Sequence, residues 1–301
     1  RRMSTAFDHS QMDIKPRNED FQINADMPRE WLNDDAAVTY WFNAMSVVFP
    51  EGERLFMDSV RAYKDQIDDP KLLEQVRGFV AQEAIHGREH EVYNEVLEEQ
   101  GLNAAKLERL TKIIMGYARK QPKIAQLAGT VAAEHFTAVM AHALLSRPEI
   151  MDDAHPTYRA IWTWHAIEEL EHKAVAYDVY ETVAGKGFGA YMRRVITFTL
   201  AMSMMNVRFT YNWSVMMRAA GHGIGLRNWG KLFGFLWGKT GFYRKAMPHF
   251  LSFYGRNFHP WDENDYHLAT HALNAYRADA DAGKTGAADA SVGELAAIPA
   301  E

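Results

Sequence analysis

The stretch His165-Ala166-Ile167-Glu168-Glu169-Leu170-Glu171-His172 decides the fold, because it places a glutamate and a histidine three residues apart within a helical pattern. On an α-helix this spacing puts the side chains of Glu169 and His172 on one face, close enough to bind one ion. The stretch Gln82-Glu83-Ala84-Ile85-His86 repeats the spacing in an earlier part of the chain. Apolar residues flank both pairs on the same faces, so the pairs interrupt stripes that face a core: Phe79, Ile161 and Val179.

Two further glutamates occur singly on apolar helical faces. Glu134 shares its face with Leu127, Val131, Ala138 and Ala141, and Glu53 shares its face with Phe49, Phe56 and Val60. An unpaired carboxylate in a core is costly, and a bound metal removes that cost. Glu51 lies on a less clearly inward face, so Glu53 is favoured as a ligand and Glu51 stays as the alternative.

The four elements follow one another as Glu, Glu-x-x-His, Glu and Glu-x-x-His, one on each of four expected helices. This is the ligand order of the ferritin-like di-iron and di-manganese carboxylate proteins. The sequence therefore predicts an all-α protein: a ferritin-like four-helix bundle with a dinuclear metal site, plus additional C-terminal helices. Four carboxylates balance two divalent cations, and the oxygen-rich ligand set suits iron, with manganese as the alternative. The predicted ligands are Glu53, Glu83, His86, Glu134, Glu169 and His172.

Several other polar residues lie near these motifs. His165 shares the face of Glu169 and His172, and it is included as a seventh ligand, with a supporting position or a place in the core as the alternative. His90 is expected to orient a ligand. His135 and His142 are expected to pack in the core, and Tyr177 and Asp178 to supply hydrogen bonds to the site. Four glutamates are expected in surface ion pairs: Glu89, Glu91, Glu168 and Glu171.

The composition excludes several classes of protein. The chain has 301 residues, 48% hydrophobic residues and a net charge of -6, without a basic tract of the kind that binds nucleic acid. It has no cysteine, which excludes disulfides, thiolate zinc sites and iron–sulfur clusters. The most apolar run, 195–207, is shorter than the roughly 20 residues of a spanning helix. We therefore expect no transmembrane segment and a cytoplasmic location.

The expected organisation has four parts. Residues 1–30 form an irregular arm, 31–185 the bundle, 186–277 a helical C-terminal extension packed on the bundle, and 278–301 a flexible tail. Methionine and aromatic residues are frequent in 191–254, which indicates packing helices or, alternatively, a cover for an apolar substrate with peripheral membrane contact.

Specific segments resemble a bacterial family described as predicted metal-dependent hydrolases. These segments are 49–54, 82–90 and 165–172, with Trp31-Leu32 near the start and Phe258-His259-Pro260-Trp261 near the end. The resemblance covers roughly residues 14 to 275 and implies a metal and a bundle of the ferritin-like superfamily. The hydrolase description implies metal dependence and leaves the reaction itself open.

Three functions follow from such a site. The main hypothesis is a di-iron oxidase or monooxygenase that activates O2 and oxidises a hydrophobic small molecule with the help of an electron donor. The alternative is a metal-dependent hydrolase in which a dinuclear metal-bound hydroxide attacks the substrate. A ferroxidase or iron-storage protein is the third. We expect a homo-oligomer, in the simplest case a dimer.

Overall fold

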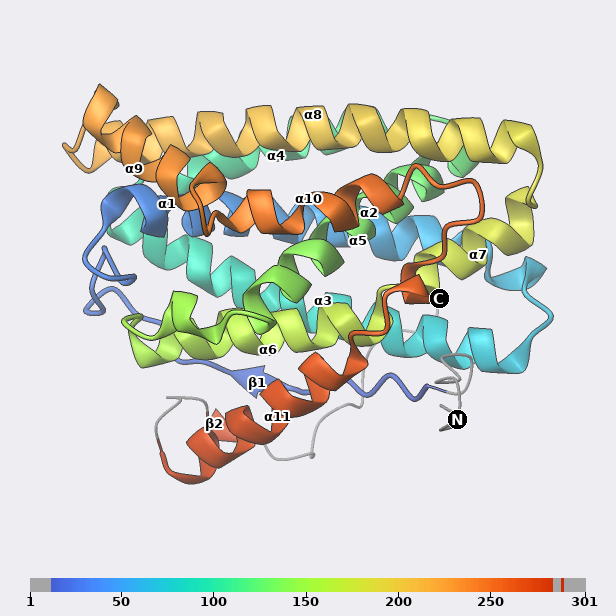
Figure 1. The fold of residues 1–301 in the computed structure, drawn as a ribbon, viewed down its shortest axis with the longest axis horizontal. Helices are drawn as coiled ribbons and strands as arrows, with labels where there is room; N and C mark the ends of the chain where they lie inside the picture. Colours follow the sequence, from blue (N-terminus) through green and yellow to red (C-terminus); the bar gives the residue numbers. More distant parts are fainter. Residues whose placement is uncertain (1–11, 284–287, 290–301) are drawn as a thin grey trace.

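The computed structural model describes residues 12–283 and 288–289, and nearly all of its regular structure is helical (Figure 1). The one sheet in these residues is a two-residue antiparallel pair in which Glu19 lies opposite Asp289. The predicted all-α class is confirmed. In chain order the elements are β1 Glu19–Asp20, α1 Ala36–Ser46, α2 Phe49–Arg61, η2 Lys64–Gln66, α3 Pro70–Glu99, α4 Ala104–Ala118, α5 Lys123–Leu145, η3 Pro148–Met151, α6 Pro156–His172, α7 Val175–Ala184, α8 Phe188–Ala219, α9 Leu226–Trp237, α10 Phe242–Ser252, η4 Pro260–Asp262, α11 Tyr266–Asp281 and β2 Ala288–Asp289.

Helix ends follow local chemistry. The side chain of Asp69 accepts a hydrogen bond from the backbone of Lys71 at the start of α3, and Pro70 occupies the first turn, where no backbone donor is needed. After α3, Gly101 adopts a left-handed φ of 81°, and the Leu102 N–H donates to the carbonyl of Leu97. This arrangement closes the last turn. A break separates α1 from α2 just before Pro50, which lies in the first turn of α2.

The helical stretch that begins at Pro156 is divided directly after His172, where α6 ends, and α7 begins at Val175. Lys173 lies in this junction. Its ammonium donates to the carbonyl of Glu263 and to the carboxylate of Asp265, both outside the helix. The break therefore separates the inward-facing His172 from a lysine that is held by a different part of the chain.

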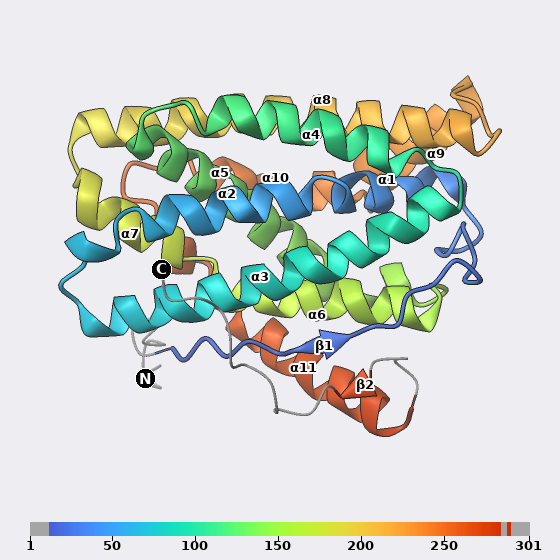
Figure 2. The ribbon, with the colours of Figure 1, turned by 180° about the vertical axis from the view of Figure 1, so that it is seen from behind.

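Five helices of the described residues enclose a common interior. α2 packs against α3 and α5, and α5 also packs against α6 and α7, while α3 contacts α6 and α7 (Figures 1 and 2). The remaining helices cover this group: α8 packs along α5 and α1, α10 against α5 and α9, and α11 against α6. Four tryptophans are almost fully buried in the single core: Trp31, Trp41, Trp164 and Trp213.

The end of the described chain is partly helical, since α11 continues to Asp281. Of the predicted tail 278–301, residues 284–287 and 290–301 lie outside the described residues. Among the helices of the described residues, none combines the length and apolar character needed to cross a membrane.

Candidate metal centre

All seven predicted ligands lie in the interior between α2, α3, α5 and α6. None of these residues is more than 4% exposed. α2 contributes Glu53, α3 contributes Glu83 and His86, and α5 contributes Glu134, while α6 carries the remaining three residues. The helical spacing predicted from sequence therefore brings the motifs of four separate segments to one place.

The residues fall into two groups of three. Glu53, His86 and His165 form one group, and Glu83, Glu169 and His172 form the other; within each, the nearest carboxylate oxygens and ring nitrogens lie within 4.8 Å of one another. In both groups the donor atoms are close enough to surround a single ion.

Glu169 faces both groups. Its Oε1 lies 3.0 Å from Nε2 of His165 and 3.8 Å from Nδ1 of His86, while its Oε2 lies 3.6 Å from Nε2 of His172. The Nε2 atom of His172 is also 3.1 Å from Oε1 of Glu83 and 3.5 Å from Oε2 of Glu134. The carboxylate of Glu169 thus occupies the position of a bridge between the two groups.

Many donor atoms at this site have no hydrogen-bond partner, although buried polar atoms in proteins almost always have one. The unpaired buried atoms here are Oε2 of Glu53, both oxygens of Glu83 and Glu134, Oε2 of Glu169, Nδ1 of His86 and Nε2 of His172. They converge from four helices on one space. A pair of cations would satisfy them and offset the charge of four buried carboxylates, so the residues present fit a dinuclear metal.

Each of the three histidines is held by the ring nitrogen that faces away from the cluster. His86 Nε2 lies 3.1 Å from Oε2 of Glu168, and His172 Nδ1 lies 2.9 Å from Oε1 of Gln82. His165 Nδ1 lies 2.8 Å from Nε2 of His90. Since Glu168 and Gln82 accept through these oxygens, the opposite nitrogens of His86 and His172 keep their lone pairs for a cation.

His90 is in turn held by Ser46, whose hydroxyl lies 2.8 Å from its Nδ1. Asn94 accepts a hydrogen bond from the same hydroxyl. The expectation that His90 orients a ligand rather than binding metal agrees with these contacts. Gln82 was not predicted as a supporting residue, although its position immediately before Glu83 was a possible signal.

The N-terminal arm covers the outer side of the site. The guanidinium of Arg17 lies 3.0 Å from Glu168 and 2.6 Å from Glu171, and Gln82 donates to Glu171 and to the carbonyl of Lys15. The prediction that Glu168, Glu171 and Glu89 are surface residues was wrong, since they are 0%, 7% and 4% exposed. The arm and its arginine bury helical faces that would otherwise meet solvent.

Burial and charge perturb the ionisation of the cluster. Burial, followed by the neighbouring carboxylates, raises the pKa of Glu53 and Glu134 well above the usual value. Burial also acts to raise the pKa of Glu169, but His172 and His165 hold it well below the usual value. The pKa of His172 is raised well above its usual value: burial opposes this shift, and Glu169, Glu83 and Glu134 outweigh it. These opposed shifts show a site whose charges are balanced only in part by its own imidazoles.

The choice between Glu53 and Glu51 follows from their contacts. Glu51 pairs with Arg54 at 2.5 Å and with Arg119 at 3.4 Å, so its carboxylate is already neutralised outside the cluster. Glu53 points inward, and a Cβ atom at Gly87 would lie only 3.2 Å from its Oε2. The absence of a side chain at Gly87 therefore leaves room for Glu53 against α3.

Other predicted residues lie elsewhere. The prediction that Tyr177 and Asp178 supply hydrogen bonds to the site was wrong: the Tyr177 hydroxyl donates to the carbonyl of Phe258, and Asp178 contacts His259 at 2.9 Å. These side chains point away because α7 starts a new helix after the break. His135 packs in the core as expected, and its Nε2–H donates to the carbonyl of His249 at 3.0 Å.

A second polar cluster, which we call the Lys173–Asp265 network, lies on the other side of these helices. Lys173 donates to Asp265 at 2.6 Å and to the carbonyl of Glu263 at 2.8 Å. His142 lies 3.0 Å from the other oxygen of Asp265, and His249 lies 3.3 Å from Glu263. This network joins α5 and the α6–α7 junction to the segment before α11.

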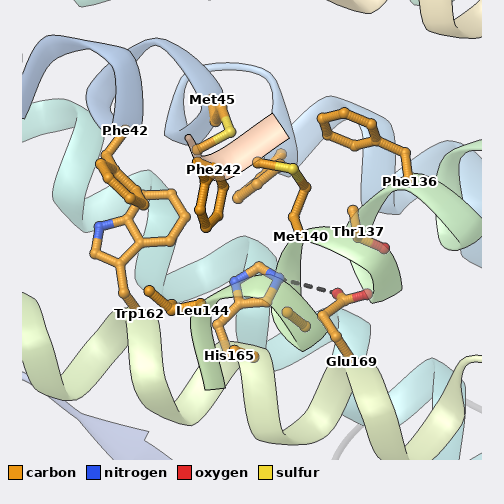
Figure 3. Close-up of a pocket in the computed structure, with 13 residues that line it drawn as sticks. Phe42, Met45, Phe136, Thr137, Met140, Leu144, Trp162, His165, Glu169 and Phe242 are labelled. Atoms are coloured by element: carbon orange, nitrogen blue, oxygen red, sulfur yellow. Dashed lines mark hydrogen bonds and ion pairs between the residues drawn. The ribbon is translucent and has the colours of Figure 1, made fainter. Parts of the chain in front are cut away.

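A small apolar cavity of about 40 Å³ adjoins the candidate centre. Figure 3 shows His165 and Glu169 on one side of it, facing the side chains of Met45, Met140 and Phe242. Phe42, Phe49 and Trp162 also line it, and no Lys or Arg does. The cavity gives an apolar group a place next to two candidate ligands.

The fold and this site define the class: an all-helical protein with candidate metal-binding groups in its interior. The model of a family described as predicted metal-dependent hydrolases matches residues 15–264. The chain therefore belongs to this family. No curated protein and no solved structure matches the chain.

This match corrects the main functional hypothesis. The sequence was interpreted as an oxygen-activating oxidase or monooxygenase, whereas the family to which the chain belongs is one of predicted metal-dependent hydrolases. The finding supports the alternative that the sequence had left open. The physical reason for the error is that carboxylate and imidazole ligands serve both chemistries, so ligand type alone does not separate them.

Proposed function

We propose that the protein is a hydrolase that depends on two divalent cations held between α2, α3, α5 and α6. The observation that carries the proposal is the convergence of unpaired, buried carboxylate and imidazole atoms from four helical segments. The membership of the chain in a family of predicted metal-dependent hydrolases supports the reaction class.

In this proposal Glu53, His86 and His165 would hold one cation and Glu83 and His172 the other, with Glu169 facing both groups. Glu134 completes the second position. The oxygen-rich set suits divalent iron or manganese. The order of ligands along the chain supports a ferritin-like four-helix bundle over residues 31–185, with 186–277 as an extension that covers it.

Bound cations supply positive charge that stabilises the charge developing during hydrolysis and that makes water a better nucleophile. The residues of the chain do the rest. Glu168, Gln82 and His90 fix the ring orientations of the three histidines. Phe49 and Trp162 pack beside His165 and limit the access of bulk water.

The cavity indicates the substrate class. Its lining lacks the Lys or Arg side chains that phosphate recognition uses, and it is mostly hydrocarbon. We therefore propose a neutral substrate with an apolar group, such as a carboxylic ester or an amide, rather than a phosphate ester. At about 40 Å³ the cavity has room for only a few water molecules. The flexible side chains of Met45 and Met140 must therefore move to admit a substrate.

The test is a hydrolysis assay on protein loaded separately with manganese, ferrous iron or zinc. Chromogenic alkyl esters should be cleaved in a metal-dependent manner, and chromogenic phosphate esters should be cleaved at least about tenfold more slowly. Glu83→Ala should abolish both metal binding and hydrolysis, whereas Glu95→Ala, an exposed glutamate on the same helix, should change neither. Ester cleavage that persists in Glu83→Ala, or in chelator-treated protein, would contradict the proposal.

A further inference from the structure

The charge of the chain is unevenly distributed. Residues 182–261 contain eleven of the 33 Lys and Arg residues and none of the 39 Asp and Glu residues, although the whole chain has a net charge of -6. The segment contains α8, α9 and α10. This part of the molecule is therefore strongly positive on a protein that is acidic as a whole.

The same segment exposes apolar side chains in a regular pattern. On α8 the residues Ile196, Leu200, Met204, Val207 and Tyr211 follow one another at steps of four, four, three and four, and they are 51%, 60%, 57%, 71% and 42% exposed. These steps keep them on one face of the helix over roughly 22 Å. Solvent-facing surfaces seldom carry such a continuous stripe without a partner.

Basic residues surround this stripe. The helical spacing puts Arg193 before it and Arg218 after it on the same face of α8. α4 lies beside α8 along one edge of the molecule in both views, and Arg208 of α8 donates to the carbonyl of Leu107 in α4 (Figures 1 and 2). The outer side of α4 and the turn that follows it add four exposed basic residues and two exposed apolar ones: Lys106, Arg109, Lys112, Ile113 and Tyr117 in α4, and Lys120 after it.

We call these residues of α8 and α4 the α8–α4 face. Glu108 is the one carboxylate within α4, and it accepts a hydrogen bond from Asn94 of α3. α8 contains no carboxylate. The face thus combines an aliphatic stripe with cations and almost lacks negative charge.

We propose that the α8–α4 face docks onto the surface of an anionic lipid bilayer. The aliphatic stripe enters the boundary between head groups and acyl chains, and the arginines and lysines meet anionic head groups. This interaction goes beyond the proposed hydrolysis and does not depend on it.

Other partners fit these residues less well. A second copy related by two-fold symmetry would bring two strongly basic surfaces together, and like charges oppose such a contact. A nucleic acid would pair with the cations but would leave the aliphatic stripe in water. An anionic bilayer satisfies the apolar and the charged residues at once.

α9 shows the same combination next to the end of α8. Its exposed residues Leu226, Trp229, Phe233 and Trp237 share one face, and Arg227 and Lys231 lie beside them. Lys231 pairs with Asp35 of α1 at 2.9 Å, and Trp229 packs on Trp213 at 4.7 Å. Tryptophan and basic residues on one amphipathic helix are typical of helices that lie in the membrane interface.

The experiment is co-sedimentation of the full chain with vesicles of phosphatidylcholine, with and without phosphatidylglycerol, at low and high salt. We expect binding to the vesicles that contain phosphatidylglycerol, weakened by salt. Leu200→Ser should weaken the partitioning about tenfold, because the buried area of one aliphatic side chain is lost. Lys112→Gln should weaken it about fivefold at low salt only.

Val92→Ser is the matched control, because Val92 is a 38% exposed apolar residue on α3, outside the face. It should bind as the unchanged protein does, and helical circular dichroism should show that all variants fold. Equal binding of Leu200→Ser and Val92→Ser would overturn the proposal. So would a dimer in analytical ultracentrifugation that Leu200→Ser dissociates while no variant binds vesicles, since the stripe would then belong to a second copy. Neither readout requires metal or substrate, so a failure here leaves the hydrolase proposal intact, and the reverse holds as well.

Discussion

At two places in the chain, a residue of the candidate metal centre is followed directly by a residue beside the Lys173–Asp265 network. Glu134 and His172 belong to the centre. The residues that follow them, His135 and Lys173, line the same cavity as Asp265. Both regions contain buried charges and are rich in histidine and carboxylate, yet they differ in how their polar atoms are satisfied.

In the Lys173–Asp265 network the charges find partners within the chain. Lys173 is 4% exposed and Asp265 is 3% exposed, and each has at least two polar contacts. In the candidate centre eight carboxylate and imidazole atoms have no hydrogen-bond partner among the described residues. Histidine and acid together thus indicate a metal only where burial leaves their atoms unpaired.

The contrast between the two regions is tested most directly at Glu169, which faces both groups of the centre. We expect Glu169→Ala to lose both cations and to lower hydrolysis on the order of 10³-fold, because it removes a bridging ligand from each. Elemental analysis of the purified protein and the ester assay measure the two effects. Asp265→Ala is the counterpart in the network, and it should keep both cations. Retention of two cations by Glu169→Ala would contradict the assignment of the bridge.

Asp265→Ala should instead destabilise the fold. It leaves the ammonium of Lys173 buried without its carboxylate, which typically costs about 3–5 kcal/mol. Denaturant unfolding of the metal-loaded protein measures the change. Glu263→Ala removes a carboxylate that is 55% exposed, and it should change the unfolding free energy by less than about 0.5 kcal/mol.

The double variant Lys173→Met with Asp265→Leu separates charge from packing. Since both buried charges are removed together, most of the lost stability should return. A double variant as unstable as Asp265→Ala would show that this contact matters for its shape rather than for its charge pairing.

The same contrast explains what could be predicted from the sequence. Spacing within one helix sets which side chains share a face, so the pairs Glu83–His86 and Glu169–His172 and the all-α class followed from local pattern alone. Glu53 was favoured over Glu51 from its apolar neighbours, and the two contacts of Glu51 with arginines agree with that choice.

Contacts between segments far apart in the chain were not predictable in this way. Glu168 was expected at the surface, but it is covered by Arg17, which lies 151 residues earlier in the chain. No local sequence pattern indicates that contact. The break after His172, which turns Tyr177 and Asp178 away from the site, also depends on contacts with the segment before α11. The type of reaction could not be read from the ligands, and the family match corrected it.

Substitution of a residue that orients a candidate ligand should change metal binding less than substitution of the ligand itself. Gln82→Ala removes the acceptor of His172 Nδ1–H, so we expect metal affinity to fall about 10–100-fold while two cations still bind at saturation. Competition with a metal-sensitive dye measures this change. Gln100→Ala, at the end of the same helix, is the control and should leave affinity unchanged. Loss of a whole equivalent of metal from Gln82→Ala would show that Gln82 does more than hold a ring.

The smallest expected effect concerns the metal-free protein, whose stability should fall as the pH rises above about 7. The raised pKa values of Glu53, Glu134 and His172 mean that the folded metal-free protein holds protons that the unfolded chain has already released. Stability falls with pH wherever the folded state binds more protons, by at most about 1.4 kcal/mol per pH unit for each such proton. Burial keeps His86 neutral in this range, so it adds no slope of opposite sign.

Bound metal should remove this dependence, because the ligands are then deprotonated in the folded state as they are in the unfolded chain. Unfolding by urea between about pH 7 and pH 8.5, with and without metal, measures both slopes. Glu134→Gln should flatten the slope of the metal-free protein and raise its stability, whereas Glu263→Ala, in the network, should leave the slope as it is. A slope in the metal-free protein that Glu134→Gln does not change would mean that this carboxyl already has a partner, and the distinction between an unsatisfied centre and a satisfied network would no longer hold at that residue.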